Sequence, residues 1–150
     1  MDKLKNPNIK VEAILLEKLN FERKPKVPDK LMDSKGDIEE AKLELNGKIE
    51  RIFTEDKKAL LVKLELEIND ENKTLNILCR IVGIFSQIEP GSITLEEFAK
   101  TNAPAILFPY IRENISNVTM KAGLPPLILP PINVIKLVEE SENKNKQEKN

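Results

Sequence analysis

The chain has 150 residues, of which 40% are hydrophobic and 33% charged, a composition that fits one globular domain with its own core. Its 24 basic and 25 acidic residues leave a formal net charge of -1, which excludes the basic surface that nucleic-acid binding needs. Histidine is absent and the five glycines form no phosphate-binding motif, so we expect neither an enzyme nor a metal or cofactor site.

The sequence also bears on where the protein works. Its single cysteine, Cys79, has no partner for an intramolecular disulfide and is expected to be a small core side chain. No apolar stretch approaches the roughly 20 residues of a membrane-spanning helix, and the basic start lacks the apolar core of a signal peptide. We therefore expect a cytoplasmic protein with no membrane insertion.

Four segments have the residue pattern of β-strands. Residues 9–21 are rich in β-branched and large apolar side chains, and a polar connector follows at residues 30–40. Residues 41–53 and 60–68 alternate apolar with charged side chains, which is typical of half-buried strands. Residues 74–85 are apolar at both alternating positions, so this strand is expected to be covered on both faces or bent. Short polar turns between the last three segments predict an antiparallel sheet.

The hydrophobic period then changes to about 3.6 residues, which is that of an α-helix. Thr94, followed three residues later by a glutamate, forms a capping box for a short helix that ends near Lys100. Asn102 is suited to cap a longer helix that runs to Ala122, with Gly123 as the residue that ends it. One apolar stripe along this longer helix contains Leu107, Ile111, Ile115, Val118 and Ala122.

Residues 124–132 are unusual because two Pro-Pro pairs enclose three apolar residues. The prolines prevent regular hydrogen bonding and predict a stiff, extended segment. One interpretation is a loop that packs on the protein's own core. The other is that Leu127 and Leu129 line an apolar groove, whose occupant can vary in sequence because burial of nonpolar area is not directional.

The C-terminal part completes an α+β fold. A short helix is expected at residues 133–140, and residues 141–150 are charged and expected to be a disordered tail. We therefore predict one domain, residues 1–140, in which a four-stranded antiparallel sheet is covered on one side by C-terminal helices.

Three stretches of the sequence resemble the SecB family of bacterial export chaperones. The helix carries PAILFPYIRE at residues 104–113, which is similar to that family's LFPYxRE run. Gly123 and the LPPLILPPIN of residues 124–133 look like the family's proline-rich crossover, and GIFS at residues 83–86 looks like the end of its fourth strand. The resemblance covers approximately residues 11–138 and implies the same fold.

The resemblance implies an ATP-independent holdase, which binds unfolded or nascent polypeptides in an apolar groove and needs no cofactor. It also implies a homotetramer, a dimer of dimers in which two protomers form an eight-stranded layer and two such dimers join through their long helices. The residues that would line the groove are Ile84, Phe85, Leu127, Leu129, Ile132, Ile135 and Leu137. Those that would join the dimers are Leu107, Ile111, Ile115 and Val118.

The resemblance also implies acidic residues on the sheet surface, where the translocase motor SecA docks. Glu22 matches one such position, but Lys18 stands where a second acid is expected, and reversed charge at a rim reduces attraction and on-rate. Three alternative functions are therefore compatible with the sequence. They are a chaperone for protein export, a dedicated chaperone of an antitoxin in a toxin–antitoxin system, and a structural or scaffolding oligomer without chaperone activity.

Overall fold

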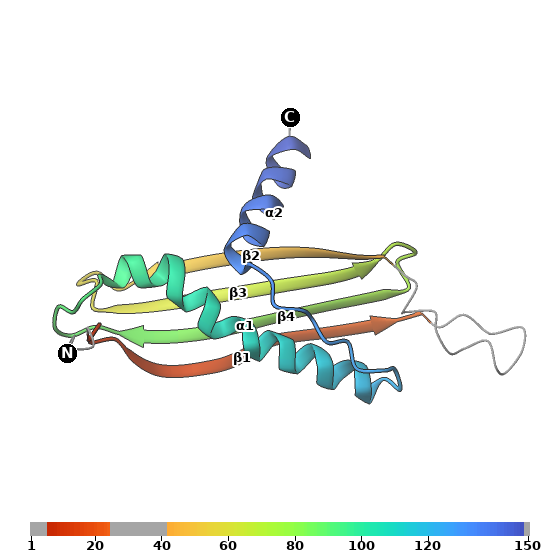
Figure 1. The fold of residues 1–150 in the computed structure, drawn as a ribbon, viewed down its shortest axis with the longest axis horizontal. Coiled ribbons are helices and arrows are strands. Elements are labelled where there is room, and N and C mark those ends of the chain that lie inside the picture. The colour runs from red at the N-terminus through yellow and green to blue at the C-terminus, as the bar shows by residue number, and fades with distance from the viewer. Residues whose placement is uncertain (1–5, 25–41, 149–150) are drawn as a thin grey trace, which may run out of the picture.

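Four strands form one antiparallel sheet in the order β1-β4-β3-β2 (Figure 1). The computed structural model describes residues 6–24 and 42–148, so the expected connector at residues 30–40 lies outside the described residues. The strands are β1 (Lys10–Arg23), β2 (Leu43–Phe53), β3 (Ala59–Asp70) and β4 (Leu75–Ser86). The antiparallel sheet that alternation and short turns predict is therefore confirmed.

β3 and β4 form the centre of the sheet and supply most of its buried face. Alternate residues of β3 between Leu60 and Ile68 are buried, and the charged residues between them face the other side. In β4 the alternate residues between Leu75 and Phe85 are buried in the same way. Val82, on the opposite face of β4, is buried as well, which agrees with the apolar character of both alternating positions.

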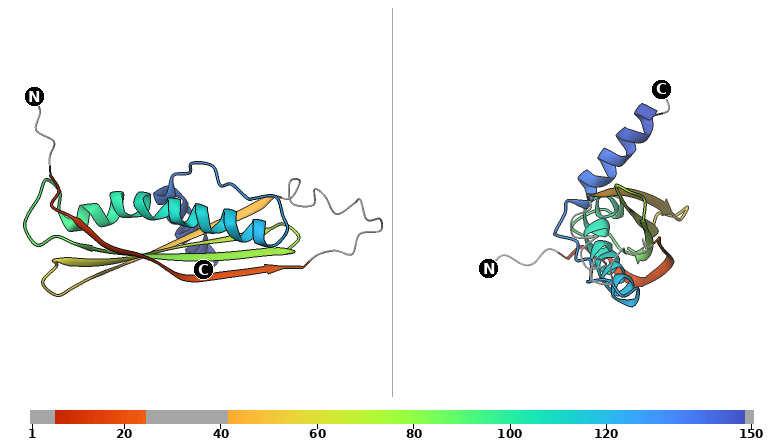
Figure 2. Two further views of the ribbon diagram at one scale, coloured as in Figure 1. Left: turned by 90° about the horizontal axis from the view of Figure 1, so that it is seen from below. Right: turned by 90° about the vertical axis from the view of Figure 1, so that its right-hand side faces the viewer.

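One continuous helix, α1 (Leu95–Lys121), lies along this buried face (Figure 2). Oγ1 of Thr94 accepts a hydrogen bond from the N–H of Glu97 at 3.1 Å, so the predicted cap at the start of the helix is confirmed. The predicted division into two helices is wrong, because Asn102 lies inside α1 and begins no second helix. Buried residues occur on both sides of this point. The stabilisation from packing one long helix on the sheet therefore outweighs the cost of the hydrogen bond that Pro104 cannot donate.

α1 ends where the sequence predicts. Gly123 has a φ of +78°, a left-handed conformation that glycine adopts without strain, and its N–H bonds to the carbonyl of Met120 at 3.0 Å. The N–H of Leu124 bonds to the carbonyl of Thr119 at 3.1 Å. This Schellman motif satisfies carbonyl groups at the helix end, and the chain then returns across the sheet to the second helix (Figure 1).

The second helix, α2 (Val134–Glu148), is longer than predicted. Residues 141–148 continue this helix, which therefore extends past residue 140, where the predicted helix and domain end. The buried Ser141 anchors the helix on β2, and glutamates followed by lysines four positions later favour helix beyond it. The charged composition alone does not indicate this part of α2, but the spacing of the charges does favour a helix.

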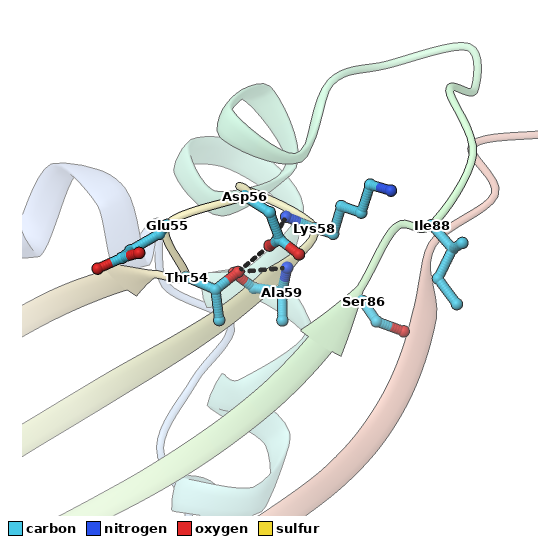
Figure 3. A pocket seen from close by; sticks show the side chains of 7 residues that line it. All are labelled: Thr54, Glu55, Asp56, Lys58, Ala59, Ser86 and Ile88. Atoms are coloured by element: carbon cyan, nitrogen blue, oxygen red, sulfur yellow. Dashed lines mark hydrogen bonds between the residues drawn. The ribbon is translucent and has the colours of Figure 1, made fainter.

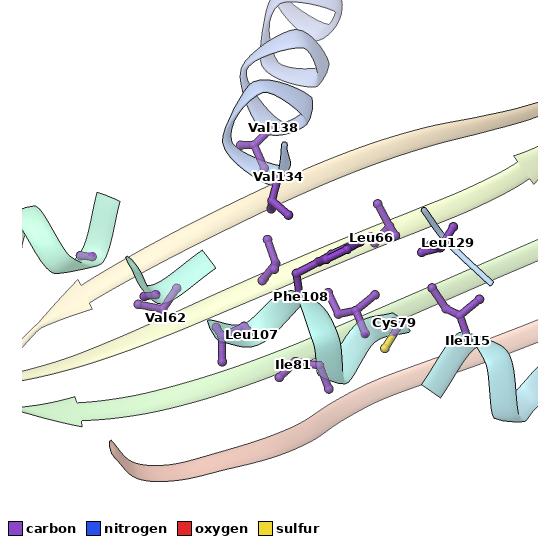
Figure 4. Packing of buried hydrophobic residues seen from close by; sticks show 14 of the residues in the cluster. Val62, Leu66, Cys79, Ile81, Leu107, Phe108, Ile115, Leu129, Val134 and Val138 are labelled. Carbon is purple, nitrogen blue, oxygen red and sulfur yellow. The ribbon is translucent and has the colours of Figure 1, made fainter. Parts of the chain in front are cut away.

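The core lies between the sheet and the two helices (Figure 4). Leu107 and Phe108 of α1 and Val134 of α2 belong to one buried cluster with Val62 and Ile81 of the sheet. The prediction that C-terminal helices cover one side of the sheet is confirmed. Within the described part of the chain, no helix is long and apolar enough to cross a membrane.

Burial also corrects the interface expected along the apolar stripe of α1. This stripe packs on the sheet of its own chain, and Val118 keeps only part of its surface. The solvent-facing side of α1 carries Tyr110 and Met120 instead, which are both exposed. The side chains that are 0% exposed and so cannot join two dimers are Leu107, Ile111 and Ile115.

Candidate functional site

A cleft of about 270 Å³ opens between β2, α1 and α2. Half of its lining side chains are apolar and half are charged, with both signs of charge present. Pro104 and Val138 are themselves buried, so the accessible nonpolar area comes from the half-buried Ile49 and Ile135, with charged groups beside it. The lining residues are Ile49 and Arg51 of β2, Lys100 and Pro104 of α1, and Ile135, Val138, Glu139 and Glu142 of α2.

Two hydrogen-bonded contacts fix the walls of this cleft. Nε of Arg51 donates to the carbonyl of Ala99 at 2.9 Å, which ties β2 to α1. Oγ of Ser141 accepts the N–H of Gly47 at 2.9 Å and donates to the carbonyl of Leu137 at 2.8 Å, which ties α2 to β2. Both contacts join elements that are distant in sequence, so the cleft exists only in the folded chain.

Gly47 lets α2 cross β2 at close range. A Cβ atom at this position would lie 3.2 Å from Cγ2 of Val138 and 3.5 Å from the side chain of Leu137. A larger residue there would push α2 outward. The position of α2, and with it one wall of the cleft, depends on the missing side chain at Gly47.

The segment between α1 and α2, residues 124–133, forms neither helix nor strand, which agrees with its prolines. Among the described residues, the main chain of residues 125–131 makes one hydrogen bond, from the N–H of Leu127 to Oγ1 of the buried Thr119 at 2.9 Å. The side chains then alternate, since Ile128 is exposed and Leu129 is buried. The segment packs one side on the core and leaves the other in solvent.

The seven residues expected to line one groove do not lie together. Phe85 is 0% exposed, and its ring packs edge-on against Phe98 with the ring centroids 4.9 Å apart. Leu129 is 3% exposed. Both are core residues, which corrects the expectation that they contact a bound polypeptide. Ile84 alternates with Phe85 along β4 and so lies on the opposite face of the sheet from α1.

The other four expected groove residues lie on the helix side of the sheet. Ile135 lines the cleft. The three that are half-buried against the core are Leu127, Ile132 and Leu137. Sequence analysis missed Ile49 and Pro104 as cleft residues. The alternation of the second strand does place Ile49 on its apolar side, but no local signal shows that α2 crosses beside it.

A second hollow, of about 630 Å³, lies at the turn between β2 and β3 (Figure 3). The carboxylate of Asp56 accepts hydrogen bonds from the N–H of Lys58 at 3.0 Å and from the hydroxyl of Thr54 at 2.7 Å. These bonds lower the pKa of Asp56 below its ordinary value. They also close the turn itself, so the polar groups here serve the hairpin and indicate no ligand.

Charged side chains cluster on the sheet face that α1 does not cover. Glu17 projects from a bulge in β1, and its Oε1 lies 3.1 Å from Nζ of Lys63 and 3.1 Å from a guanidinium nitrogen of Arg80. Arg80 also bonds to Glu65 at 2.6 Å. The hydrogen bonds from Lys63 and Arg80 lower the pKa of Glu17, and those to Glu65 and Glu17 raise the pKa of Arg80.

This cluster decides what charge the uncovered face presents. Arg80, on the fourth strand, is matched by two carboxylates, while Lys18 beside it in β1 is exposed. The expected SecA-facing residue, Glu22, is exposed near the end of β1 and lies 4.0 Å from Lys24. The carboxylates of Glu17 and Glu65 are therefore compensated, whereas Glu44 and Glu67 on the same face have no ion pair among the described residues.

β1 is an edge strand with large apolar side chains in solvent. Leu15 is 52% exposed and Leu16 is 49% exposed, and these neighbours point to opposite faces of the sheet. Val11 is exposed as well. No described element covers the outer edge of this strand, so its unpaired main-chain groups and apolar side chains are open to a partner.

The described residues offer no constellation for covalent or metal chemistry. No group of three or more metal-ligating side chains occurs among residues 6–24 and 42–148. Burial raises the pKa of the Cys79 thiol to about 11, which keeps it protonated and inert at neutral pH. The useful features of the molecule are therefore surfaces: the cleft and the open edge of β1.

The chain is similar to known proteins over most of its length. Residues 2–145 match the family model of SecB, described as preprotein translocase subunit SecB. The protein-export protein SecB of Xanthomonas oryzae pv. oryzae is 28% identical over 136 residues, which is 90% of this chain and 77% of that protein. In fold, the chain is similar to the SecB-like chaperone Rv1957 of Mycobacterium tuberculosis, solved with a ChAD peptide from the antitoxin HigA1. The TM-score is 0.63 at 17% identity, over 84% of this chain and 88% of that one.

Other relatives share shorter stretches. The protein-export protein SecB of Anaplasma phagocytophilum is 37% identical over 57% of this chain and 59% of its own length. The uncharacterized protein MJ0357 of Methanocaldococcus jannaschii is 48% identical over 44% of this chain and 46% of its own. The chain thus spans about half the length of these two relatives. Because the family model matches residues 2–145, this chain belongs to the SecB family, whose members are chaperones and not enzymes.

Proposed function

We propose that the protein is an ATP-independent chaperone of the cytoplasm, which binds unfolded polypeptide, prevents its aggregation and serves protein export. The family match over residues 2–145 supports this, and the cleft between β2, α1 and α2 is the observation that carries it. Apolar side chains in a cleft of about 270 Å³ can bury a nonpolar side chain of a client. Because such burial is not directional, it gives affinity without reading a sequence.

Self-association is part of the same proposal. Two β1 strands paired antiparallel about a two-fold axis would join two sheets into one layer and bury Leu15 and Leu16 on its two faces. Two such dimers would form a homotetramer through the solvent-facing side of α1, where Tyr110 and Met120 are exposed. The apolar area that a single chain leaves in solvent is then covered.

A dedicated chaperone of one partner, such as an antitoxin, is the second candidate. The charge on the uncovered sheet face favours it, since Arg80 is paired there and Lys18 is exposed. A translocase motor that docks on acidic groups would meet the basic Lys18 and an already paired Arg80 on this part of the face. Binding of purified SecA separates the two candidates. A complex with SecA supports export, whereas client binding without SecA binding supports the dedicated role.

Aggregation of a chemically unfolded client, followed by light scattering without nucleotide, tests the proposed function. The wild-type protein is expected to suppress aggregation at stoichiometric amounts. A variant with Ile49→Asp and Ile135→Asp places charge on the apolar lining and should lose most of this protection, once circular dichroism shows that it is folded.

Ile88→Asp is the matched control, because Ile88 is exposed at the other hollow. It should protect the client as the wild type does. Equal protection by the cleft variant and the control would contradict the cleft as the binding site. No protection by the wild type would contradict the chaperone itself.

A further inference from the structure

Asn46 and Gly47 form the only asparagine–glycine pair of the sequence, and both lie inside β2. Asparagine and glycine are unfavourable within a strand, and a glycine there often marks the close approach of another part of the chain. That other part is α2, which crosses β2 here (Figure 1), because a Cβ atom at Gly47 would lie 3.2 Å from Cγ2 of Val138. The packing of α2 therefore requires a glycine directly after Asn46.

An asparagine that precedes a glycine can lose its side-chain amide without an enzyme. The main-chain nitrogen of Gly47 attacks Cγ of Asn46, the bond from Cγ to the side-chain nitrogen breaks, and the proton of the attacking N–H leaves in ammonia. Water then opens the cyclic imide at either carbonyl, which leaves aspartate or isoaspartate at this position. The net reaction consumes water and releases ammonia, with no oxidation or reduction. Glycine favours the attack because it has no side chain to crowd the nitrogen and its main chain is the most adaptable.

The folded chain restrains the nitrogen that must attack. Asn46 is paired with Glu67 of β3, and the extended main chain of a strand directs the next N–H away from the preceding side chain. β2 is an edge strand, so β3 pairs with only one side of it. On the other side, the N–H of Gly47 donates to Oγ of Ser141 at 2.9 Å, and both residues are buried. This bond holds the proton that the nitrogen has to lose.

The side-chain amide of Asn46 is more accessible than this nitrogen. Gly47 faces α2, so Asn46 faces the uncovered side of the sheet, where it is only half-buried. Water therefore reaches the amide in the folded state, whereas the nitrogen becomes free only when α2 opens locally from β2. The docking of α2 is thus the contact that controls the reaction.

We propose that Asn46–Gly47 is a site of spontaneous deamidation that the docking of α2 on β2 suppresses, and that conversion to isoaspartate releases α2. Isoaspartate carries the main chain through its side-chain carbon, which moves the N–H of Gly47 away from Ser141. Both products also place a carboxylate opposite Glu67, and like charges directly opposite each other destabilise a sheet. α2 forms one wall of the cleft, so the reaction removes the support of that wall, whatever the cleft binds.

Peptide mapping by mass spectrometry tests the suppression. The full chain is incubated in heavy-oxygen water, so that only residues converted during the incubation carry the label. Ser141→Ala removes the acceptor of the Gly47 N–H, and conversion of Asn46 should become roughly 5-fold faster than in the wild type. Thr119→Ala is the matched control, because it removes a buried hydroxyl on α1 that accepts the N–H of Leu127 at 2.9 Å. It should convert Asn46 at about the wild-type rate.

Three results of this experiment would overturn the proposal. Equal acceleration by Ser141→Ala and Thr119→Ala would show that the reaction proceeds from the globally unfolded chain and not from an opened α2. An unchanged rate in Ser141→Ala would show that α2 gives no protection. No conversion of Asn46 in chemically unfolded wild-type chain would mean that the pair is not a deamidation site.

Limited digestion with trypsin tests the release of α2. Deamidated wild-type chain, purified by ion exchange, should be cut faster than the unmodified chain at Lys136 and Lys144, two exposed residues of α2. Asn46→Asp is the control, because it adds the same carboxylate but keeps the normal main chain, and it should be cut more slowly than the deamidated chain. Equal cleavage of the deamidated and unmodified chains would contradict the release of α2.

Discussion

β1 and β2 are the two edge strands of one sheet, and they differ in that α2 is hydrogen-bonded to the outer edge of β2 at Gly47. β1 is 14 residues long and exposes apolar side chains on both faces. β2 is 11 residues long, has α2 bonded at Gly47, and borders a cleft. An uncovered apolar edge suits a long partner strand, such as the same strand of a second copy. A partly covered edge with a cleft suits a short segment of varying sequence.

The largest expected effect is on the open edge. A variant with Leu15→Lys and Leu16→Glu places charge on both faces of β1, and charged edge strands resist pairing. We expect it to lose the pairing through β1, so its mass in light scattering should fall below that of the wild-type assembly. Ile52→Lys, which charges an exposed apolar position on β2, is the control and should assemble as the wild type does. An unchanged mass for the β1 variant would show that this edge is not the contact.

The centre of the sheet should tolerate added atoms less than either edge. A Cβ at Gly83 would lie 2.7 Å from the ring of Phe85 and 2.8 Å from the side chain of Leu107. Gly83→Ala is therefore expected to cost about 1–3 kcal/mol in the free energy of unfolding, measured by denaturant titration. Gly47→Ala meets its neighbour at 3.2 Å and should cost less. A larger cost at Gly47 would mean that α2 is held on β2 more rigidly than the sheet centre is packed.

The hydrogen bond from Gly47 of β2 to Ser141 of α2 should contribute less to the free energy of unfolding. Ser141→Ala leaves the buried N–H of Gly47 without its partner, which we expect to cost about 1–2 kcal/mol. Exchange of the Gly47 amide should also become faster, since the edge is then open at this point. Ser92→Ala, at an exposed serine in the loop before α1, is the control. No change in either measurement would mean that α2 does not protect this edge.

The smallest expected effect is a pH dependence at the bulge of β1. The pKa of Glu17 in the folded chain is lowered from 4.5 by hydrogen bonds from Lys63 and Arg80. Its stabilising contribution is therefore present above the unfolded value near 4.5 and is lost as the pH falls through the lower folded value. Glu17→Gln should make the melting temperature less dependent on pH in this acidic range. Glu22→Gln is the control, and an equal slope for both variants would contradict the role of the cluster.

Local sequence patterns predicted the sheet well because each strand's alternation reflects its own burial. The charged residues of β3 and the buried residues between them occur where alternation places them. The left-handed Gly123 is likewise a local signal. The predicted helix start at Asn102 was wrong. Suitability as a cap is a local property, whereas the continuity of α1 depends on packing along the whole sheet.

The candidate site was harder to predict because it joins three distant elements. Alternation indicates that Ile49 is on the apolar side of its strand, but not that Ile135 and Pro104 lie beside it. Phe85 and Leu129 were expected to contact a client because the family resemblance places them in a groove, and the fold uses them in the core instead. The same resemblance grouped Ile84 with them, and one step along a strand places it on the other face.

Site-specific photo-crosslinking to an unfolded client tests the central claim most directly. A photoreactive residue at Ile135 would lie in the cleft, and the same residue at Ile84 would lie on the opposite face of the sheet. We predict crosslinks to the client from position 135 and none above background from position 84. Crosslinks from position 84 without crosslinks from position 135 would show that clients bind the other face, and would contradict the cleft as the site of binding.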